Sequence, residues 1–112
     1  YPWGDEFDPD KANTLEGRIL GTSPVGAYPG GAAECGALDL SGNVYEWTHS
    51  LFKDYPYQVD DGREAVEAEG KRVMRGGSWS GNQRSARVSS RTDPHPDTFD
   101  FSSSFRVVVA PV

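Results

Sequence analysis

Alternation of apolar and polar residues is confined to short stretches of this chain. Residues 38–47 begin as a turn and then alternate, which places Val44 and Glu46 on one face of a strand and Tyr45 and Trp47 on the other. The pattern therefore predicts a turn that leads directly into a strand.

Two further strands are predicted in the second half of the chain. Residues 72–79 start as a strand and stop at Gly76 and Gly77, which permit positive φ or the close approach of another backbone. We expect the chain to bend there. The apolar run 105–109 is typical of a buried terminal strand.

The rest of the chain has no regular hydrophobic period. Residues 1–36 are rich in turn formers and are expected to be ordered loop, with an extended piece at 22–29 where prolines disfavour helix. Residues 53–71 are polar and indicate an exposed excursion that tolerates variation, with a weak helical option at 64–69. Residues 80–104 have no pattern, and an irregular segment of about 25 residues between two strands indicates function.

Composition narrows the fold class and the kind of partner. The chain has 112 residues, so it is one domain at most, and its 13 glycines and 8 prolines favour a loop-rich fold over a helical bundle. The formal charge of −6 argues against nucleic acid, which needs a clustered basic surface, and suits divalent cations better. The arginines from Arg63 to Arg91 are interpreted as partners of Asp and Glu. No apolar run is long enough to span a bilayer.

Sulfur and imidazole chemistry have little support in this sequence. Cys35 is the only cysteine, so an internal disulfide or a cysteine-built zinc site is excluded within the chain, and cytosolic residence is permitted. We interpret Cys35 as a small buried apolar residue. His49 and His95 are far apart in sequence and are interpreted as surface or packing residues.

Four motifs occur in order along the chain: Tyr-Pro-Trp-Gly-Asp at 1–5, Gly-Asn-Val-Tyr-Glu-Trp at 42–47, Arg-Gly-Gly-Ser-Trp at 75–79 and Phe-Arg at 105–106. Together they resemble the sulfatase-modifying-factor family, whose best-known member is formylglycine-generating enzyme. The resemblance implies an α+β, C-type lectin-like fold, loop-rich with short antiparallel strands. Residues 1–112 match the C-terminal part of one such domain, so we expect the N-terminal half from preceding residues or an associated chain.

The resemblance bears on catalysis through two positions. In the family's enzymes two cysteines follow the Gly-Gly-Ser motif and carry a copper-dependent oxidation of a substrate cysteine. By direct offset these positions are Gly81 and Ala86, and neither side chain can ligate copper(I) or form a thiolate. The resemblance therefore implies a domain without copper that does not catalyse the family's reaction.

A calcium site is also implied by the resemblance. Asp39 and Glu46 would give carboxylates, while Gly42 and Val44 would give main-chain carbonyls, an all-oxygen set that calcium favours. The alternative is that Asp39 merely starts a turn and Glu46 is solvated. A second family site would use Asn13, but its aligned loop lacks the expected acidic ligand.

The irregular segment 80–104 is the remaining candidate for function. It resembles the diversified region of the variable proteins of diversity-generating retroelements, which share this fold and bind ligands with the residues between Gly-Gly-Ser-Trp and Phe-Arg. Exposed phenylalanines among small polar residues suit recognition, whereas the alternative is that Phe99 and Phe101 fill the core. The candidate ligand-binding residues are Ser80, Asn82, Arg84, Thr92, Asp93, His95, Thr98, Phe99, Asp100, Phe101 and Ser102.

The sequence thus predicts a noncatalytic, calcium-stabilised binding domain whose partner is a protein or another macromolecular surface. Two alternatives stay open: an accessory lectin-like domain of an iron-dependent sulfoxide synthase, and a formylglycine-generating-type oxidase. A three-histidine iron-binding bundle upstream would favour the first alternative. Copper binding with thiol-dependent turnover would favour the second.

Overall fold

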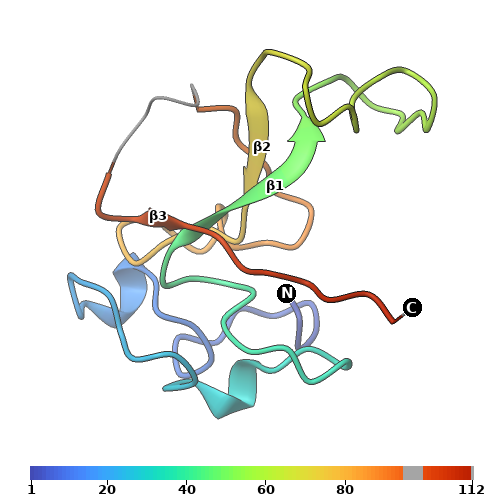
Figure 1. The fold of residues 1–112 in the computed structure, drawn as a ribbon. Coiled ribbons are helices and arrows are strands. Elements are labelled where there is room, and N and C mark those ends of the chain that lie inside the picture. The colour runs from blue at the N-terminus through green and yellow to red at the C-terminus, as the bar shows by residue number, and fades with distance from the viewer. Residues whose placement is uncertain (95–99, 112) are drawn as a thin grey trace.

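Three short strands organise the computed structural model, which describes residues 1–94 and 100–111. They are β1 (Tyr45–Leu51), β2 (Arg72–Arg75) and β3 (Ser103–Ser104), and they form one sheet in the order β2-β1-β3. β1 pairs with β2 antiparallel, as expected, whereas β1 pairs with β3 in parallel (Figure 1). The loops of the first forty residues lie on one side of this sheet, next to the start of β1.

The alternation that predicted β1 and the double glycine that predicted its partner's end are both confirmed. Trp47 of β1 lies opposite Met74 of β2, and the register shifts before Leu51. β2 stops at Gly76 and Gly77, whose φ angles of 93° and 71° lie in the left-handed region that glycine adopts at little cost. The strand therefore turns sharply where the sequence placed a bend.

Helical structure in the described residues is limited to single turns. The described residues contain two single turns of 3-10 helix, η1 (Leu15–Gly17) and η2 (Pro29–Gly31), and no α-helix. The helical option at 64–69 is wrong, because that stretch is a series of turns, and 22–29 contains a turn where an extended piece was expected. No helix in the described part of the chain has the length and apolarity needed to cross a membrane.

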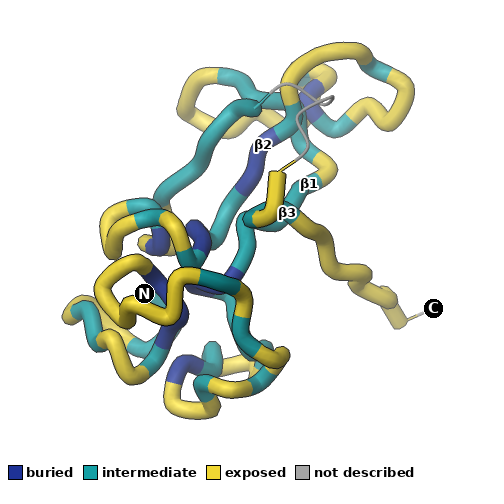
Figure 2. Tube along the Cα trace, turned by 90° about the vertical axis from the view of Figure 1, so that its left-hand side faces the viewer, coloured by how far each residue is buried: buried dark blue, intermediate teal, exposed yellow. Residues whose placement is uncertain are grey.

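The buried residues among those described, dark blue in Figure 2, are largely polar. Main-chain hydrogen bonds hold them together. The Gly42 amide donates to the Gly76 carbonyl at 2.7 Å, and the Asn43 amide donates to the Asn13 carbonyl at 2.8 Å. The Ser41 hydroxyl donates to the Ala86 carbonyl at 2.7 Å. Three segments far apart in sequence are thereby joined around one turn. The buried apolar residues beside it are few: Ala12, Val73, Met74 and Ala86.

The expectation of a buried strand at 105–109 is wrong. The last strand ends at Ser104, and the following apolar residues are exposed, reaching 87% at Val109. Figure 2 shows this run leaving the sheet as an extended tail. A strand needs both a ladder partner and an apolar cover, and within the described residues the run has neither.

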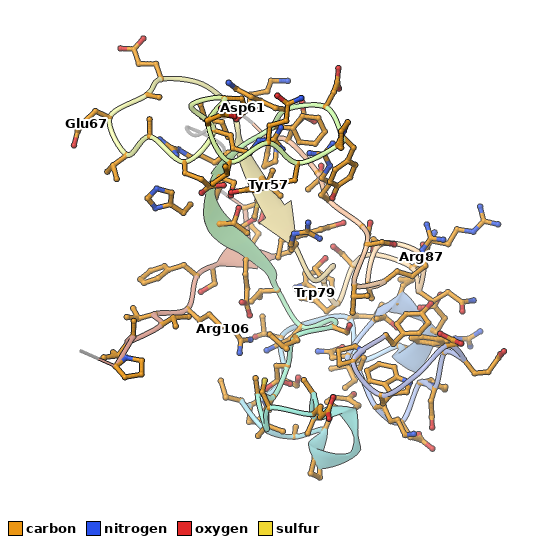
Figure 3. All side chains as sticks on the ribbon, turned by 90° about the vertical axis from the view of Figure 1, so that its right-hand side faces the viewer. Tyr57, Asp61, Glu67, Trp79, Arg87 and Arg106 are labelled. Carbon is orange, nitrogen blue, oxygen red and sulfur yellow. The ribbon has the colours of Figure 1, made fainter. Side chains whose placement is uncertain are left out.

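The excursion between β1 and β2 is exposed, as predicted, yet it is built around a buried arginine. Arg63 is only 3% exposed, and its guanidinium donates to the Asp61 carboxylate at 2.6 Å and to the carbonyls of Asp54 and Pro56. The predicted pairing of arginine with acid is thus confirmed at Arg63. Figure 3 shows Asp61 and Tyr57 within this excursion. Its tolerance of variation stays a prediction, which the burial of Arg63 argues against at that position.

The Asp61 carboxylate makes the stability of this excursion depend on pH. Hydrogen bonds from Arg63 lower the pKa of Asp61 from 3.8 to about 2. Because the folded pKa is depressed, the stabilisation is complete above the unfolded value and is lost as pH falls from about 4 toward 2. We expect the difference in unfolding midpoint between the wild type and Asp61→Asn to shrink over that window, measured by urea titration at each pH. A difference that stays constant down to pH 2 would contradict this assignment.

Candidate ligand-binding site

Trp79 ties together the two ends of the irregular segment 80–104. Its amide donates to the Asn43 carbonyl at 2.9 Å, which fixes the start of the segment to the buried turn. Its indole Nε1 donates to the Phe101 carbonyl at 3.4 Å, which brings residues 22 positions apart into contact. Trp79 lies where the sheet meets the N-terminal loops (Figure 3). The segment is therefore a closed loop with defined ends.

The first part of the loop rests on the N-terminal residues. The Leu15 amide donates to the Gly81 carbonyl at 2.9 Å, and the Tyr1 hydroxyl donates to the Gln83 carbonyl at 3.0 Å. The Gln83 amide donates to the Glu16 carboxylate at 2.8 Å. Burial raises the pKa of Glu16, but this hydrogen bond and one from Thr14 outweigh it and lower the pKa. With the backbone held in this way, the candidate side chains on this part face solvent: Ser80, Asn82 and Arg84.

Residues in the middle of the loop contact the sheet. Thr92 forms an isolated antiparallel bridge with Met74, with amide-to-carbonyl distances of 2.9 and 3.0 Å. The Asp93 carboxylate pairs with the Lys71 ammonium at 3.1 Å. These two candidates thus contact β2 and its approach, whereas the first part of the loop contacts the N-terminal residues. Three further candidates lie outside the described residues: His95, Thr98 and Phe99.

The end of the loop presents a phenylalanine on a braced turn. Asp100 Oδ1 accepts hydrogen bonds from the Ser102 amide at 2.8 Å and from the Ser103 hydroxyl at 2.7 Å. The hydrogen bond from Ser103 is the main cause of a lowered pKa at Asp100, which keeps this acceptor charged. Phe101 is 93% exposed, so the alternative that it fills the core is wrong. The Tyr45 amide fixes the turn by donating to the Ser102 carbonyl at 2.6 Å.

The two positions aligned with the family's cysteines are a partly exposed glycine and a buried alanine. A Cβ atom at Gly81 would lie 2.5 Å from the Ser85 hydroxyl, and Ala86 is fully buried with its main chain packed on Gly77. Cys35 is exposed, which corrects the expectation that it is a buried apolar residue. Its turn lies in the loop before β1. Within the described ranges no three His, Cys, Asp or Glu side chains gather as a metal cluster.

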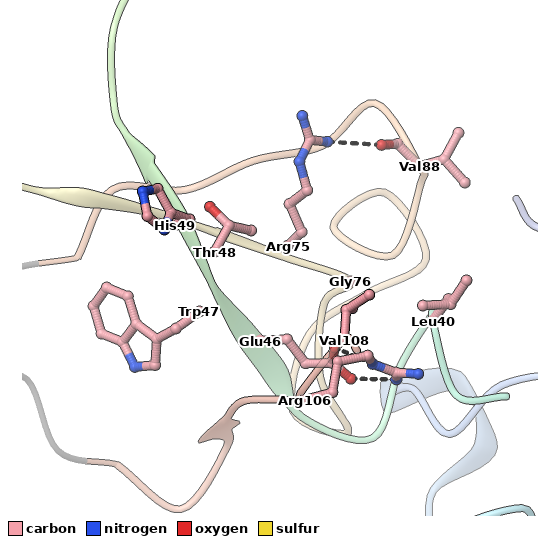
Figure 4. Close-up of a pocket in the computed structure, with 10 residues that line it drawn as sticks. All are labelled: Leu40, Glu46, Trp47, Thr48, His49, Arg75, Gly76, Val88, Arg106 and Val108. Atoms are coloured by element: carbon pink, nitrogen blue, oxygen red, sulfur yellow. Dashed lines mark hydrogen bonds and ion pairs between the residues drawn. The ribbon is translucent and has the colours of Figure 1, made fainter. Parts of the chain in front are cut away.

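The residues predicted to bind calcium have a different set of partners. Both carboxylate oxygens of Glu46 accept hydrogen bonds from the Arg106 guanidinium at 2.5 Å (Figure 4). The same guanidinium donates to the carbonyls of Leu38 at 3.0 Å and Asp39 at 3.2 Å. The Asp39 carboxylate accepts from the Gly26 amide at 2.7 Å. Arg106 thus contacts one of the four implied ligands, the Glu46 carboxylate, and calcium binding by this set stays a prediction.

Asn13 is the residue that would contribute to the family's second calcium site. Its side-chain amide donates to the Gly21 carbonyl at 2.9 Å and the Ser23 hydroxyl at 3.2 Å, while its Oδ1 is buried without a partner among the described residues. The nearby Glu16 carboxylate is engaged by Thr14 and by the loop. One amide oxygen alone does not make a calcium site.

Sequence reasoning missed Arg106 and a cavity beside it. The cavity, of about 650 Å³, is bounded by Glu46, Trp47, Arg75 and Arg106 and opens along β1 (Figure 4). Arg106 was visible in the sequence only as half of the Phe-Arg motif. The structure pairs Arg106 with Glu46 of the 42–47 motif, so the two motifs are in contact.

This frame, with its buried turn, double-glycine bend and closed C-terminal loop, defines a domain of the formylglycine-generating-enzyme type that lacks the cysteine pair. Comparison with known families agrees over nearly the whole sequence. The chain belongs to the family described as sulfatase-modifying factor enzyme 1-like domain, whose model matches residues 1–111. The resemblance inferred from the four motifs is thereby confirmed.

Relatives of this chain include proteins of different activity. Hercynine oxygenase of Mycobacterium tuberculosis is 41% identical over 100 residues, covering 86% of this chain and 24% of that protein. Inactive C-alpha-formylglycine-generating enzyme 2 of Bos taurus is 36% identical over 122 residues, covering 95% of this chain and 36% of that protein. The solved Treponema denticola variable protein 1 superposes with a TM-score of 0.71 at 24% identity, over 86% of this chain and 34% of that one, which is a likeness of fold. The chain thus spans about a quarter to a third of the length of these relatives.

Proposed function

We propose that this chain is a noncatalytic binding domain and that its loop 80–104 contacts a protein or another macromolecular surface. The observation that carries the proposal is Phe101, which is 93% exposed on a turn whose backbone is tied to Trp79 and β1. A large exposed aromatic on a fixed backbone loses little entropy on binding, which is the property of residues that dominate interface energies.

The polar neighbours of Phe101 support recognition of a surface. Ser80 is exposed and follows Trp79 directly, and the Trp79 indole donates to the Phe101 carbonyl. Asn82 and Arg84 add exposed amide and guanidinium groups on a backbone held by the N-terminal residues. Such a mixture of rigid aromatic and adaptable polar groups suits protein ligands.

The absence of catalysis is also part of the proposal. Gly81 and Ala86 supply no thiolate, and copper(I) chemistry of the family's kind requires one. The Bos taurus relative, which bears the name of an inactive enzyme, shows that this family includes such members. Purified protein is expected neither to bind copper(I) tightly nor to convert a peptide cysteine to an aldehyde, and either result would overturn this part.

A second candidate function is an accessory domain of a larger oxygenase. It is favoured by the 41% identity to hercynine oxygenase, and the metal ligands would then come from outside this chain. The described residues contain no α-helix, so the helical part of the predicted α+β class stays a prediction under both candidates. A three-histidine iron-binding bundle in the same protein would decide for the oxygenase.

The binding role is tested by photo-cross-linking at matched positions. A benzophenone amino acid is placed at Phe101 in the whole protein, and in a control at Val59, which is 80% exposed in the distant excursion. We expect a discrete cross-linked partner at Phe101 that the control lacks. Affinity for that partner, measured by calorimetry, should then fall at least about tenfold in Phe101→Ala and stay unchanged in Val59→Ala. Equal cross-linking from both positions would contradict the assignment of the loop.

A further inference from the structure

A small cavity lies where the excursion between β1 and β2 meets the sheet. Its volume is about 190 Å³, and the ionisable side chains that line it are Arg63, Arg75, Arg91, Tyr55 and Tyr57. None of the described residues that line it is acidic. At about 30 Å³ for each molecule of liquid water, the cavity has room for about six waters. It therefore suits a small ion, or the charged end of a larger molecule, better than a whole drug-sized ligand.

Arg75 brings a positive charge to this cavity and is held there by neutral oxygen atoms. Its Nη1 donates to the Val88 carbonyl at 2.9 Å (Figure 4) and to the Ser90 carbonyl at 3.4 Å. Its Nη2 donates to the Tyr55 hydroxyl at 3.3 Å. None of the ion pairs between described residues includes Arg75. A guanidinium has five N–H groups, so these contacts leave donors for a further acceptor.

Arg91 is fixed at the same cavity by aromatic rings. Its guanidinium carbon lies 4.3 Å from the centre of the Phe52 ring and 4.0 Å from the centre of the Tyr55 ring, and its Nη1 donates to the Lys53 carbonyl at 2.6 Å. Rings stack on the faces of a guanidinium, whereas its N–H groups point outward from the edge. Tyr55 joins the two arginines, because its ring contacts Arg91 and its hydroxyl accepts from Arg75. That hydroxyl keeps its own proton to donate.

The other polar side chains that line the cavity have partners within the protein. Arg63 forms its ion pair with Asp61 at 2.6 Å. The Glu64 carboxylate accepts from the Ser50 hydroxyl at 2.6 Å and from the Tyr57 hydroxyl at 3.2 Å. The lining threonine donates to a main-chain carbonyl. The open donors are therefore those of the other two arginines and the tyrosine that joins them, and Glu64 is the nearby charge that opposes an anion.

We propose that this cavity binds a small oxyanion, a phosphate or carboxylate group, through Arg75, Arg91 and the Tyr55 hydroxyl. Planar guanidinium groups match the oxygen spacing of both ligands, and donors that are fixed in advance lose little entropy on binding. The formal charge of −6 does not prevent this, because salt screens distant surface charges more than it screens adjacent ones. The site uses none of the candidate ligand-binding residues of the loop 80–104 and does not rest on the proposed binding function.

The proposal is tested in the whole wild-type protein by titration with inorganic phosphate at constant ionic strength, with sodium chloride as the balancing salt. The side-chain N–H resonances of the arginines are followed by NMR. We expect saturable shifts at Arg75 and Arg91 with a dissociation constant on the order of 1 mM, as a few charge-assisted hydrogen bonds give to a small anion. Arg106, which is paired with Glu46, is the internal control and should not shift. Shifts without saturation, or equal shifts at all three arginines, would overturn the proposal.

The role of Tyr55 is tested with a pair of matched variants. Tyr55→Phe keeps the ring against Arg91, and Tyr55 is 59% exposed, so the fold should tolerate the change. Its affinity for phosphate should fall at least about fivefold, the effect of losing one hydrogen bond. Tyr57→Phe removes a hydroxyl that contacts Glu64 instead, so its affinity should stay unchanged. Equal losses in the two variants would contradict the assignment.

Two further measurements test the charge at the site and the class of its ligand. Glu64→Gln removes the opposing negative charge and should tighten phosphate binding, whereas weaker binding would contradict the proposed position of the anion. Acetate is then titrated in the same way as phosphate. Tighter binding of phosphate assigns the site to phosphate groups, tighter binding of acetate assigns it to carboxylates, and binding of neither would overturn the proposal.

Discussion

Gly42→Ala is expected to lower the free energy of unfolding by about 3 kcal/mol, from about 1–2 kcal/mol of left-handed strain and about 1–3 kcal/mol of overpacking. Gly42 has φ of 79°, and a Cβ atom there would lie 2.5 Å from the Asn13 carbonyl oxygen. The clash is with main chain, which cannot rotate away. The Gly42 amide donates to the Gly76 carbonyl and the Asn43 amide to the Asn13 carbonyl, so any shift of Gly42 breaks the turn that joins three segments.

Gly36→Ala is the matched control for this prediction. Gly36 has a similar φ of 84°, but a Cβ atom there meets nothing within 4 Å. The control should therefore show only the conformational cost, about 1–2 kcal/mol. Urea unfolding of both variants separates strain from overpacking, and equal losses would show that the buried turn relaxes around the added methyl group.

The strands that sequence reasoning predicted correctly are those defined by local patterns. Alternation around Tyr45 to Trp47 identifies β1, since side chains on a strand point to opposite faces in turn. The glycine pair after Arg75 identifies the end of β2, since positive φ at two successive positions is incompatible with a continuing strand. Both signals lie within a few residues of the feature that they predict.

The features that were missed depend on contacts between distant positions. The apolar residues at 105–109 favour burial, but a local pattern does not tell whether another layer of the fold packs on them. In the described residues this run is exposed. The buried turn is likewise held by amides and carbonyls from residues 13, 43 and 76, and every residue has those groups. No pattern of side chains marks such a polar core.

The candidate site also combines features that local motifs predict with contacts between distant residues. Its family followed from the motifs, and the sequence left the exposure of Phe101 as one of two alternatives. The tie from Trp79 to Phe101 spans 22 positions and the pair of Glu46 with Arg106 spans 60. Periodicity carries no information at those separations. The calcium prediction treated Glu46 as a ligand because the family resemblance implied it, and it did not consider that Arg106 could reach the same carboxylate.

Met74→Ala is expected to cost about 3 kcal/mol, within the range of about 2–5 kcal/mol for truncating a buried methionine. Met74 is 2% exposed and is one of the few buried apolar residues. Few apolar side chains are therefore present to move into the cavity that the truncation leaves. Val66→Ala, at an exposed position in the excursion, is the control and should change stability by less than about 0.5 kcal/mol.

Hydrogen exchange in Met74→Ala then tests whether the binding loop and the sheet unfold together. The bridge from Met74 to Thr92 uses main-chain atoms, which the substitution leaves in place. If the loop is anchored to the sheet as a unit, protection of the Thr92 amide should fall by the same factor as global stability, about a hundredfold for 3 kcal/mol. A much larger loss at Thr92 alone would mean that the loop opens independently of the sheet, and pre-organisation of Phe101 would then rest on Trp79 and Tyr45 rather than on β2.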